Sequence, residues 1–140
     1  MKLTRRETLV LGGAAAGAAL FMPMMAQAAE VDAIVAEFTG GADVAEGGVD
    51  LTAPEIAENG NTVPVEVAAE GAASIILIAS GNPEGNVMTA NFGEAAGAQR
   101  VATRIRLAGT QDVIAIAKMA DGTFVKASKA VKVTIGGCGG

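Results

Sequence analysis

Hydrophobic and polar residues follow two different periods along this chain. In residues 31–38 the apolar positions recur at the spacing of a helix: Val31, Ile34, Val35 and Phe38. Two glycines at 40–41 follow this run and are predicted to end the helix. Beyond residue 62 the pattern changes to short strand-like runs separated by turn residues. The sequence therefore predicts one short helix followed by a strand-rich domain.

The predicted strands are short and are bounded by turn residues. They cover residues 63–67, 74–80, 87–92, 101–107, 113–119 and 131–135. Gly-Asn-Pro-Glu-Gly-Asn at 81–86 is a turn signal, and Asp121-Gly122 is typical of a hairpin. Residues 40–61 are rich in turn residues, with a helical turn expected from Pro54. Short strands without long helices between them predict an all-β, antiparallel β-sandwich. In its last strand, Val131, Val133 and Ile135 are expected to face the core.

Two of the predicted strands are apolar on both faces. These are the runs Ile75–Ile78 and Val113–Ala117. A strand in a sandwich normally has one face in water, so the second face of each run must be covered. A loop or the N-terminal helix could cover it, or a partner subunit could. If a partner covers it, the chain is expected to form a stable heterodimer with a second small β protein.

Residues 1–28 have the order of a secretory signal peptide. A basic start containing Arg5 and Arg6 precedes an uncharged run, and Ala26-Gln27-Ala28 provides a cleavage site after Ala28. The arginine pair with Leu9 is similar to the twin-arginine export motif. The uncharged run is short and interrupted by Gly and Pro, which disfavours a membrane anchor. We therefore expect export, cleavage after Ala28, and no membrane attachment afterwards.

The composition excludes several classes of function. The chain has no His and one Cys, so a zinc, copper or haem site is not predicted, and no Ser-His or Cys-His pair can form. The net charge is −5, and cleavage of the basic leader would make the protein more acidic. Binding to nucleic acid is therefore not expected. The carboxylates between residues 43 and 58 are interpreted as a solvated face. The sequence predicts a non-catalytic protein without a cofactor or a metal.

The one cysteine, Cys138, lies in a C-terminal Gly-Gly-Cys-Gly-Gly segment. Glycine is conformationally permissive, so a flexible arm is expected over residues 136–140, with flexibility from Gly136, Gly137, Gly139 and Gly140. The thiol can extend about 10 Å from Ile135. An odd cysteine in an exported protein indicates intermolecular pairing or a reactive thiol.

Several segments together resemble the SoxY family of sulfur-carrier subunits in the periplasmic thiosulfate-oxidising (Sox) system. The most specific is Ile135 to Gly140, the Gly-Gly-Cys-Gly-Gly end that follows Val-Lys-Val-Thr, and the leader adds to it. Glu58-Asn59-Gly60 with Val63-Pro64-Val65, and the Asn82-Pro83 turn, extend the resemblance. The turn at 81–86 departs from the more proline-rich pattern of the family.

The resemblance implies an immunoglobulin-like sandwich over residues 29–135 and a periplasmic location. It implies a SoxZ-like companion subunit in a heterodimer, and Cys138 as the covalent attachment point for sulfur intermediates. It further implies transient docking of the arm, residues 136–140, to a c-type cytochrome that oxidises the thiol, a sulfate-hydrolysing enzyme and a sulfur-dehydrogenating enzyme. The chain itself is then a carrier and not an enzyme.

Two other functions fit parts of the sequence. An exported structural domain could be tethered to a partner through a Cys138 disulfide. A cytosolic carrier could use a Gly139-Gly140 thiocarboxylate, but the export leader argues against that activation.

Overall fold

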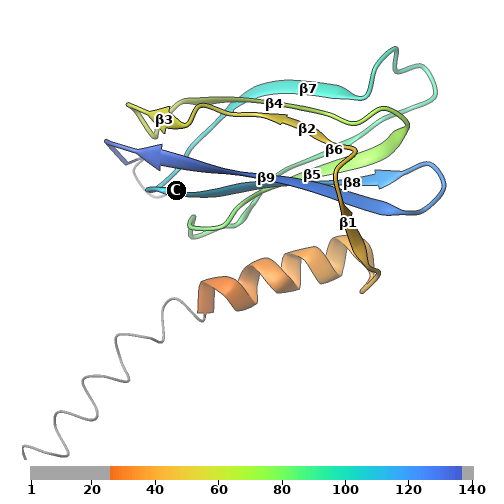
Figure 1. Ribbon diagram of the computed structural model, residues 1–140, viewed down its shortest axis with the longest axis horizontal. Helices are drawn as coiled ribbons and strands as arrows, with labels where there is room; N and C mark the ends of the chain where they lie inside the picture. Colours follow the sequence, from red (N-terminus) through yellow and green to blue (C-terminus); the bar gives the residue numbers. More distant parts are fainter. Residues whose placement is uncertain (1–25, 137–140) are drawn as a thin grey trace, which may run out of the picture.

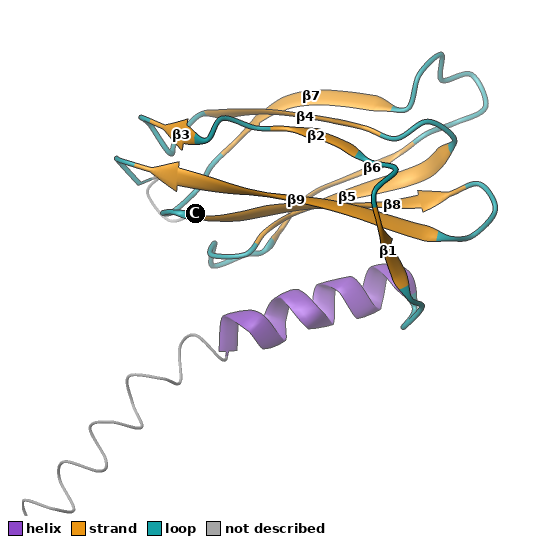
Figure 2. Cartoon of the chain, viewed as in Figure 1, coloured by secondary structure: helices purple, strands orange, loops and turns teal. Residues whose placement is uncertain are grey.

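The computed structural model describes residues 26–136. A helix over residues 26–39 leads into two sheets packed face to face (Figures 1 and 2). The strands are β1 (Val44–Glu46), β2 (Asp50–Thr52), β3 (Ile56–Ala57), β4 (Val63–Ala68), β5 (Ala72–Ala79), β6 (Asn86–Asn91), β7 (Arg100–Ile105), β8 (Gln111–Met119) and β9 (Phe124–Val133). One sheet has the order β1-β9-β8-β5-β6 with β3 also paired to β9, and the other has the order β2-β4-β7. The predicted sandwich with a short N-terminal helix is confirmed.

Strand β9 organises the larger sheet because three strands pair with it. It pairs antiparallel with β8, whereas the short strands β1 and β3 both pair with it in parallel. The expected helical turn at Pro54 is therefore wrong. Residues 56–57 form β3, in register with Lys132 and Val133 of β9. Pairing with a strand far away in the sequence supplies backbone hydrogen bonds that a local helical turn would have had to provide.

The main core lies between the two sheets. Alternate residues of β5 and β8, among them Ile75, Leu77, Val113 and Ala115, are completely buried against β4 and β7. Val63 and Val67 of β4 are also buried. Because side chains alternate between the two faces of a strand, this core covers one of the two apolar faces of β5 and of β8.

The N-terminal helix covers the other face of these strands. Ile76, Ile78, Ile116 and Phe124 form a second buried cluster, and the helix contributes Val31, Ile34, Val35 and Phe38 to it. Phe38 meets Phe124 edge to face, with ring centroids 5.8 Å apart. The sequence left a loop, the N-terminal helix or a partner subunit as possible cover for this second face, and the helix covers it. The predicted heterodimer consequently finds no support in these strands and rests on the family resemblance. The apolar helix positions all follow the predicted cleavage site at Ala28.

Turn residues at the C-terminal end of the helix and in the β8–β9 hairpin agree with the sequence prediction. Gly40 and Gly41 have φ of 66° and 85°, in the left-handed region that favours glycine, and the helix ends there. In the β8–β9 hairpin Gly122 has φ of 86°. Thr123 donates to the carboxylate of Asp121 from its hydroxyl and its backbone N–H, at 2.6 and 2.9 Å, which lowers the pKa of Asp121. Both predicted boundaries are confirmed.

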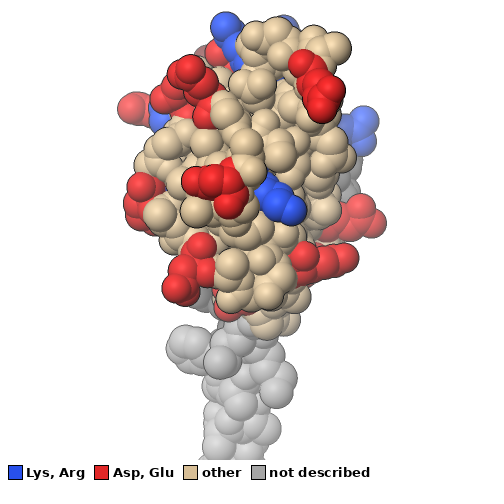
Figure 3. Space-filling model, turned by 90° about the vertical axis from the view of Figure 1, so that its right-hand side faces the viewer, with Lys and Arg blue, Asp and Glu red and all other residues tan. Residues whose placement is uncertain are grey.

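Charged side chains are spread over the domain. Figure 3 shows acidic groups distributed around one face and no single basic patch on it. Within residues 26–136, no helix has the length and apolar character needed to cross a membrane. The same part of the chain holds no cluster of His, Cys, Asp or Glu arranged to bind a metal ion.

Candidate functional site at the base of the C-terminal arm

The predicted attachment residue, Cys138, lies outside the described residues, as do Gly137, Gly139 and Gly140. The predicted export residues Arg5 and Arg6 also lie outside them. Ala28 is exposed within the helix. The structure therefore describes the base of the arm, residues 134–136, and the segments that hold it.

The segment 57–60 holds one side of the arm base. Thr134 donates its N–H to the carbonyl of Ala57 at 3.0 Å and its hydroxyl to the carbonyl of Glu58 at 3.0 Å. Gly60 donates to the carbonyl of Ile135 at 2.7 Å. These contacts continue the parallel pairing of β3 with β9 past the end of the strand. The backbone is thus fixed as far as Ile135, three residues before Cys138.

The segment 106–110 holds the other side. Val133 donates its N–H to the hydroxyl of Thr110 at 3.0 Å, and Gly136 lies against the carbonyl of Ala108. The N–H of Leu107 donates to the carbonyl of Gly60 at 2.7 Å, which joins the two segments. We call residues 57–60 and 106–110 the arm collar, because together they flank the chain where the arm leaves the sandwich.

Gly136 is required here for a reason that the sequence did not indicate. A Cβ atom on Gly136 would collide with the carbonyl oxygen of Ala108. The absence of a side chain therefore permits close approach of two backbones. The flexibility predicted for Gly136 and the other arm glycines stays a prediction.

The prediction that Ile135 faces the core as part of the last strand is wrong. Val131 is buried and Val133 is half-buried, but the side chain of Ile135 is 67% exposed. Strand β9 ends at Val133. The period-2 alternation toward the core therefore does not continue to Ile135, although its backbone remains hydrogen bonded.

The buried side-chain amides of Asn82 and Gln111 hold one segment of the collar by hydrogen bonds to its backbone. Asn82 donates to the carbonyl of Arg106 at 2.8 Å, and its side-chain oxygen accepts from the N–H of Ala108 at 2.9 Å. Gln111 donates to Asn82 and to the carbonyl of Gly109 at 2.9 and 3.0 Å, and accepts from the N–H of Gly81 at 2.8 Å. The two residues are only 5% and 8% exposed. They fix the backbone of segment 106–109 with buried hydrogen bonds.

The sequence pattern places Asn82 in a turn and gives no role to Gln111. A signal for Gln111 was present, because it shares the inward alternation of Val113 and Ala115 in the same strand. A polar residue at an inward position must find hydrogen-bond partners. Two of the partners, the N–H of Gly81 and the side-chain oxygen of Asn82, lie about 30 residues away in the sequence and could not be read from the strand itself.

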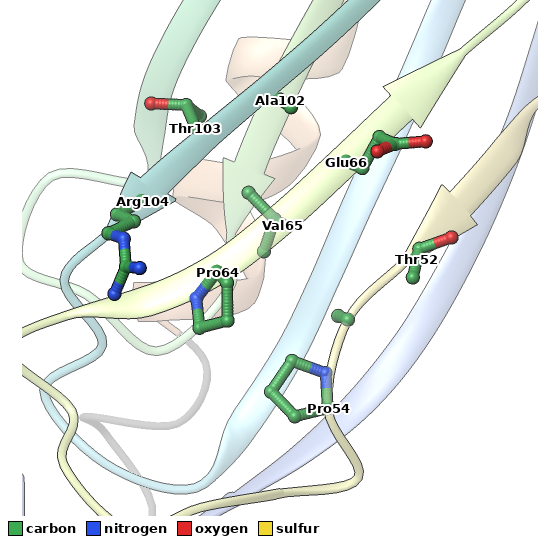
Figure 4. A pocket seen from close by; sticks show the side chains of 9 residues that line it. Thr52, Pro54, Pro64, Val65, Glu66, Ala102, Thr103 and Arg104 are labelled. Carbon is green, nitrogen blue, oxygen red and sulfur yellow. The ribbon is translucent and has the colours of Figure 1, made fainter.

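A groove of about 580 Å³ crosses the outer face of the three-stranded sheet. In Figure 4, Pro54, Pro64 and Arg104 lie at one end of it, and Thr52 and Glu66 at the other. β2 pairs only with Glu66–Ala68 of β4, so Pro64 has no strand partner on that side, as a residue without an N–H requires. Glu66 pairs with Arg100 at 2.7 Å, and this hydrogen bond and charge raise the pKa of Arg100. No predicted site residue lines this groove.

A protein-family model for the sulfur oxidation protein SoxY matches residues 35–138. The chain belongs to the SoxY family. The matched region includes the helix end, both sheets and the arm collar, and it extends to Cys138. The resemblance inferred from the sequence is confirmed.

Solved structures agree with this assignment. The sulfur carrier protein SoxY from Chlorobium limicola f. thiosulfatophilum is 32% identical, with a TM-score of 0.68, over 77% of this chain and 99% of that chain. A superoxide reductase (neelaredoxin) from Ignicoccus hospitalis is 18% identical, with a TM-score of 0.54, over 62% of this chain and 80% of that one. At that identity the second likeness concerns the sandwich fold alone. The comparison with curated proteins finds no match.

Gly136→Ala is expected to destabilise the arm base, by about 1 kcal/mol, because the new methyl group must displace the backbone at Ala108. Gly109→Ala is the matched control in the same region, since a Cβ atom there meets nothing within 4 Å. Urea denaturation of both variants measures the difference. Equal free energies of unfolding for the two variants would show that the contact between Gly136 and Ala108 is not tight.

Proposed function

We propose that this protein carries sulfur intermediates of thiosulfate oxidation, covalently attached to the thiol of Cys138. The observation that supports the proposal most is the SoxY family match, which extends to Cys138. The structural likeness to a sulfur carrier protein adds to it. The collar holds the backbone as far as Ile135, and Cys138 follows that residue by three positions in the sequence.

The family implies a cycle of oxidation and hydrolysis on the Cys138 thiol. The Cys138 thiolate and thiosulfate form a sulfur–sulfur bond, and two electrons pass to a c-type cytochrome enzyme. Water then cleaves the bond between the sulfane sulfur and the sulfonate, which releases sulfate and two protons and leaves a persulfide on Cys138. A sulfur-dehydrogenating enzyme then oxidises the persulfide with three waters to an S-sulfonate on Cys138, while six electrons pass to that enzyme and six protons are released. Hydrolysis of the S-sulfonate by a fourth water releases a second sulfate and two protons and regenerates the thiolate. The carrier supplies the thiol and the tether, which keeps each intermediate at a high effective concentration near its partners.

We further propose that the protein is located in the periplasm and forms a heterodimer with a SoxZ-like companion subunit. A periplasmic carrier with a SoxZ-like subunit fits the leader and the family. Sizing of the mature chain with and without a co-expressed companion tests the heterodimer. A monomer with no affinity for that companion would contradict it.

Intact mass of the protein isolated from its native host without reductant tests the carrier function. An adduct of tens to about a hundred daltons that is removed by reductant and absent from Cys138→Ser is expected for sulfur carriage. A protein-sized adduct on Cys138 would instead identify a structural tether. Tryptic mapping of the C-terminal peptide locates the adduct.

Export is expected to depend on the arginine pair. Arg5→Lys with Arg6→Lys should stop export by the twin-arginine route, and the mature protein should begin at Ala29. Fractionation with N-terminal mass mapping measures both. Unchanged export of the double variant would indicate the general secretory route, and an exported protein that retains Met1 would exclude cleavage. A Lys2→Arg variant, which keeps the basic start, is the control.

A further inference from the structure

The length of the arm determines which face of the domain must meet a partner enzyme. Cys138 follows Ile135 by three residues, and the backbone of Ile135 is held by Gly60. Three extended residues span about 10 Å. An enzyme whose reacting atoms lie below its own surface can therefore reach the thiol only by placing that surface against the arm collar.

Two exposed isoleucines occupy this end of the domain. Among the described residues, Ile56 and Ile135 are the large apolar side chains that remain exposed, at 60% and 67%. Ile56 lies in β3, which runs parallel to β9 toward the arm base and is in register with Lys132 at that position. The other large apolar side chains of residues 26–136 are buried or half-buried. Exposed apolar residues that gather at one end of a domain can form part of an interaction site.

We propose that Ile56 and Ile135 form the docking contact for the enzymes that receive the arm, and that these enzymes present an apolar surface around the mouth of their active-site channel. The inference rests on the proposed carrier function. Charged residues around the collar have both signs, since Lys132 and Arg106 lie near Glu55 and Glu58. Net charge therefore gives this face little selectivity, and the apolar contact supplies the binding energy that different enzymes can share.

Ile56→Gln separates docking from carriage, because Ile56 is not part of the arm. Ala120→Gln is the matched control: Ala120 is exposed at the β8–β9 hairpin, the opposite end of β9 from the arm. Ile56→Leu keeps the apolar surface and should restore docking. All proteins are used as the complex with the companion subunit.

The carrier is loaded with tetrathionate, from which the Cys138 thiolate displaces thiosulfate and retains an S-thiosulfonate. Initial rates of sulfate release by the sulfate-hydrolysing partner enzyme are then measured over a range of carrier concentrations. Ile56→Gln is expected to raise KM about tenfold with little change in kcat, as expected for loss of apolar contact area. Ala120→Gln and Ile56→Leu should remain within about twofold of the wild type.

The possible failures are distinguishable. A wild-type KM for Ile56→Gln overturns the docking surface, while turnover of the loaded wild type still supports carriage. No turnover of the loaded wild type overturns the proposed function, and the docking contact with it. If Ile56→Gln loses the companion subunit, Ile56 belongs to the interface with that subunit. If the variant converts a wild-type dimer to monomers on sizing, Ile56 belongs to the dimer interface. Either result would overturn the proposal.

Discussion

Cys138→Ser is expected to abolish carrier function completely without lowering the stability of the domain. Carriage requires a sulfur–sulfur bond, and a serine hydroxyl at neutral pH forms neither a disulfide nor a persulfide link. In the sequence, Cys138 follows the last residue of β9 by five positions. The change in the free energy of unfolding should therefore be within about 0.5 kcal/mol, as at ordinary surface positions.

Two measurements decide this prediction. The melting temperature of Cys138→Ser should equal that of the wild type, and thiosulfate-dependent electron flow in a reconstituted system should be absent. Ser128→Cys on the Cys138→Ser background places an exposed thiol elsewhere on β9 and should not restore electron flow. Turnover by Cys138→Ser would exclude a carrier thiol at this position, and unfolding of the variant would give Cys138 a structural role.

The sequence was sufficient to predict the elements whose pattern is local. Alternation identified β4 and β7, short apolar runs between turn residues identified β5 and β8, and the helical spacing of Val31 to Phe38 identified the helix. Gly40, Gly41 and Gly122 marked their boundaries because each needs a positive φ. These features depend on residues that are neighbours in the chain. The same local logic identified the Gly-Gly-Cys-Gly-Gly arm.

Features that depend on distant residues were not predictable in the same way. The short strands β1 and β3 exist because they pair with β9, about 80 residues later, and nothing local in 40–61 specifies that pairing. Periodicity showed that Ile76 and Ile116 need cover but could not choose between the helix and a partner. Ile135 continued the alternation in sequence, but the strand ends before it.

The candidate site contains one feature set by neighbouring residues and one set by distant residues. Its reactive residue was identified from the sequence, whereas the collar that holds the arm required the structure. Segments 57–60, 80–82 and 106–111 are separated by about twenty residues each and converge through hydrogen bonds to Gly60, Asn82 and Gln111. The Glu58-Asn59-Gly60 and Asn82-Pro83 segments, which carried part of the family resemblance, both belong to this support. Their shared position at the arm base gives that resemblance a physical basis.

Asn82→Ala is expected to be the most destabilising single change at the site. It would leave the carbonyl of Arg106 and the N–H of Ala108 without these partners, and would remove one of the two acceptors of Gln111. Buried polar groups without partners cost about 1–3 kcal/mol each, so a loss of about 3 kcal/mol is expected. For a domain of this size that corresponds to a fall in Tm of roughly 10 °C or more. Thermal and urea denaturation measure it.

The control for this variant is Asn91→Ala, because Asn91 is exposed at the end of β6 and should change stability by less than about 0.5 kcal/mol. The two substitutions remove the same atoms, so their difference isolates the buried hydrogen bonds. Because segment 106–109 forms one side of the collar, Asn82→Ala should also raise KM with an arm-receiving enzyme at temperatures where the domain is still folded. The reactivity of Cys138 toward a small thiol reagent should not change. Equal stabilities for the two variants would mean that Asn82 does not support the collar, and an unchanged KM alongside lost stability would mean that the collar does not direct the arm.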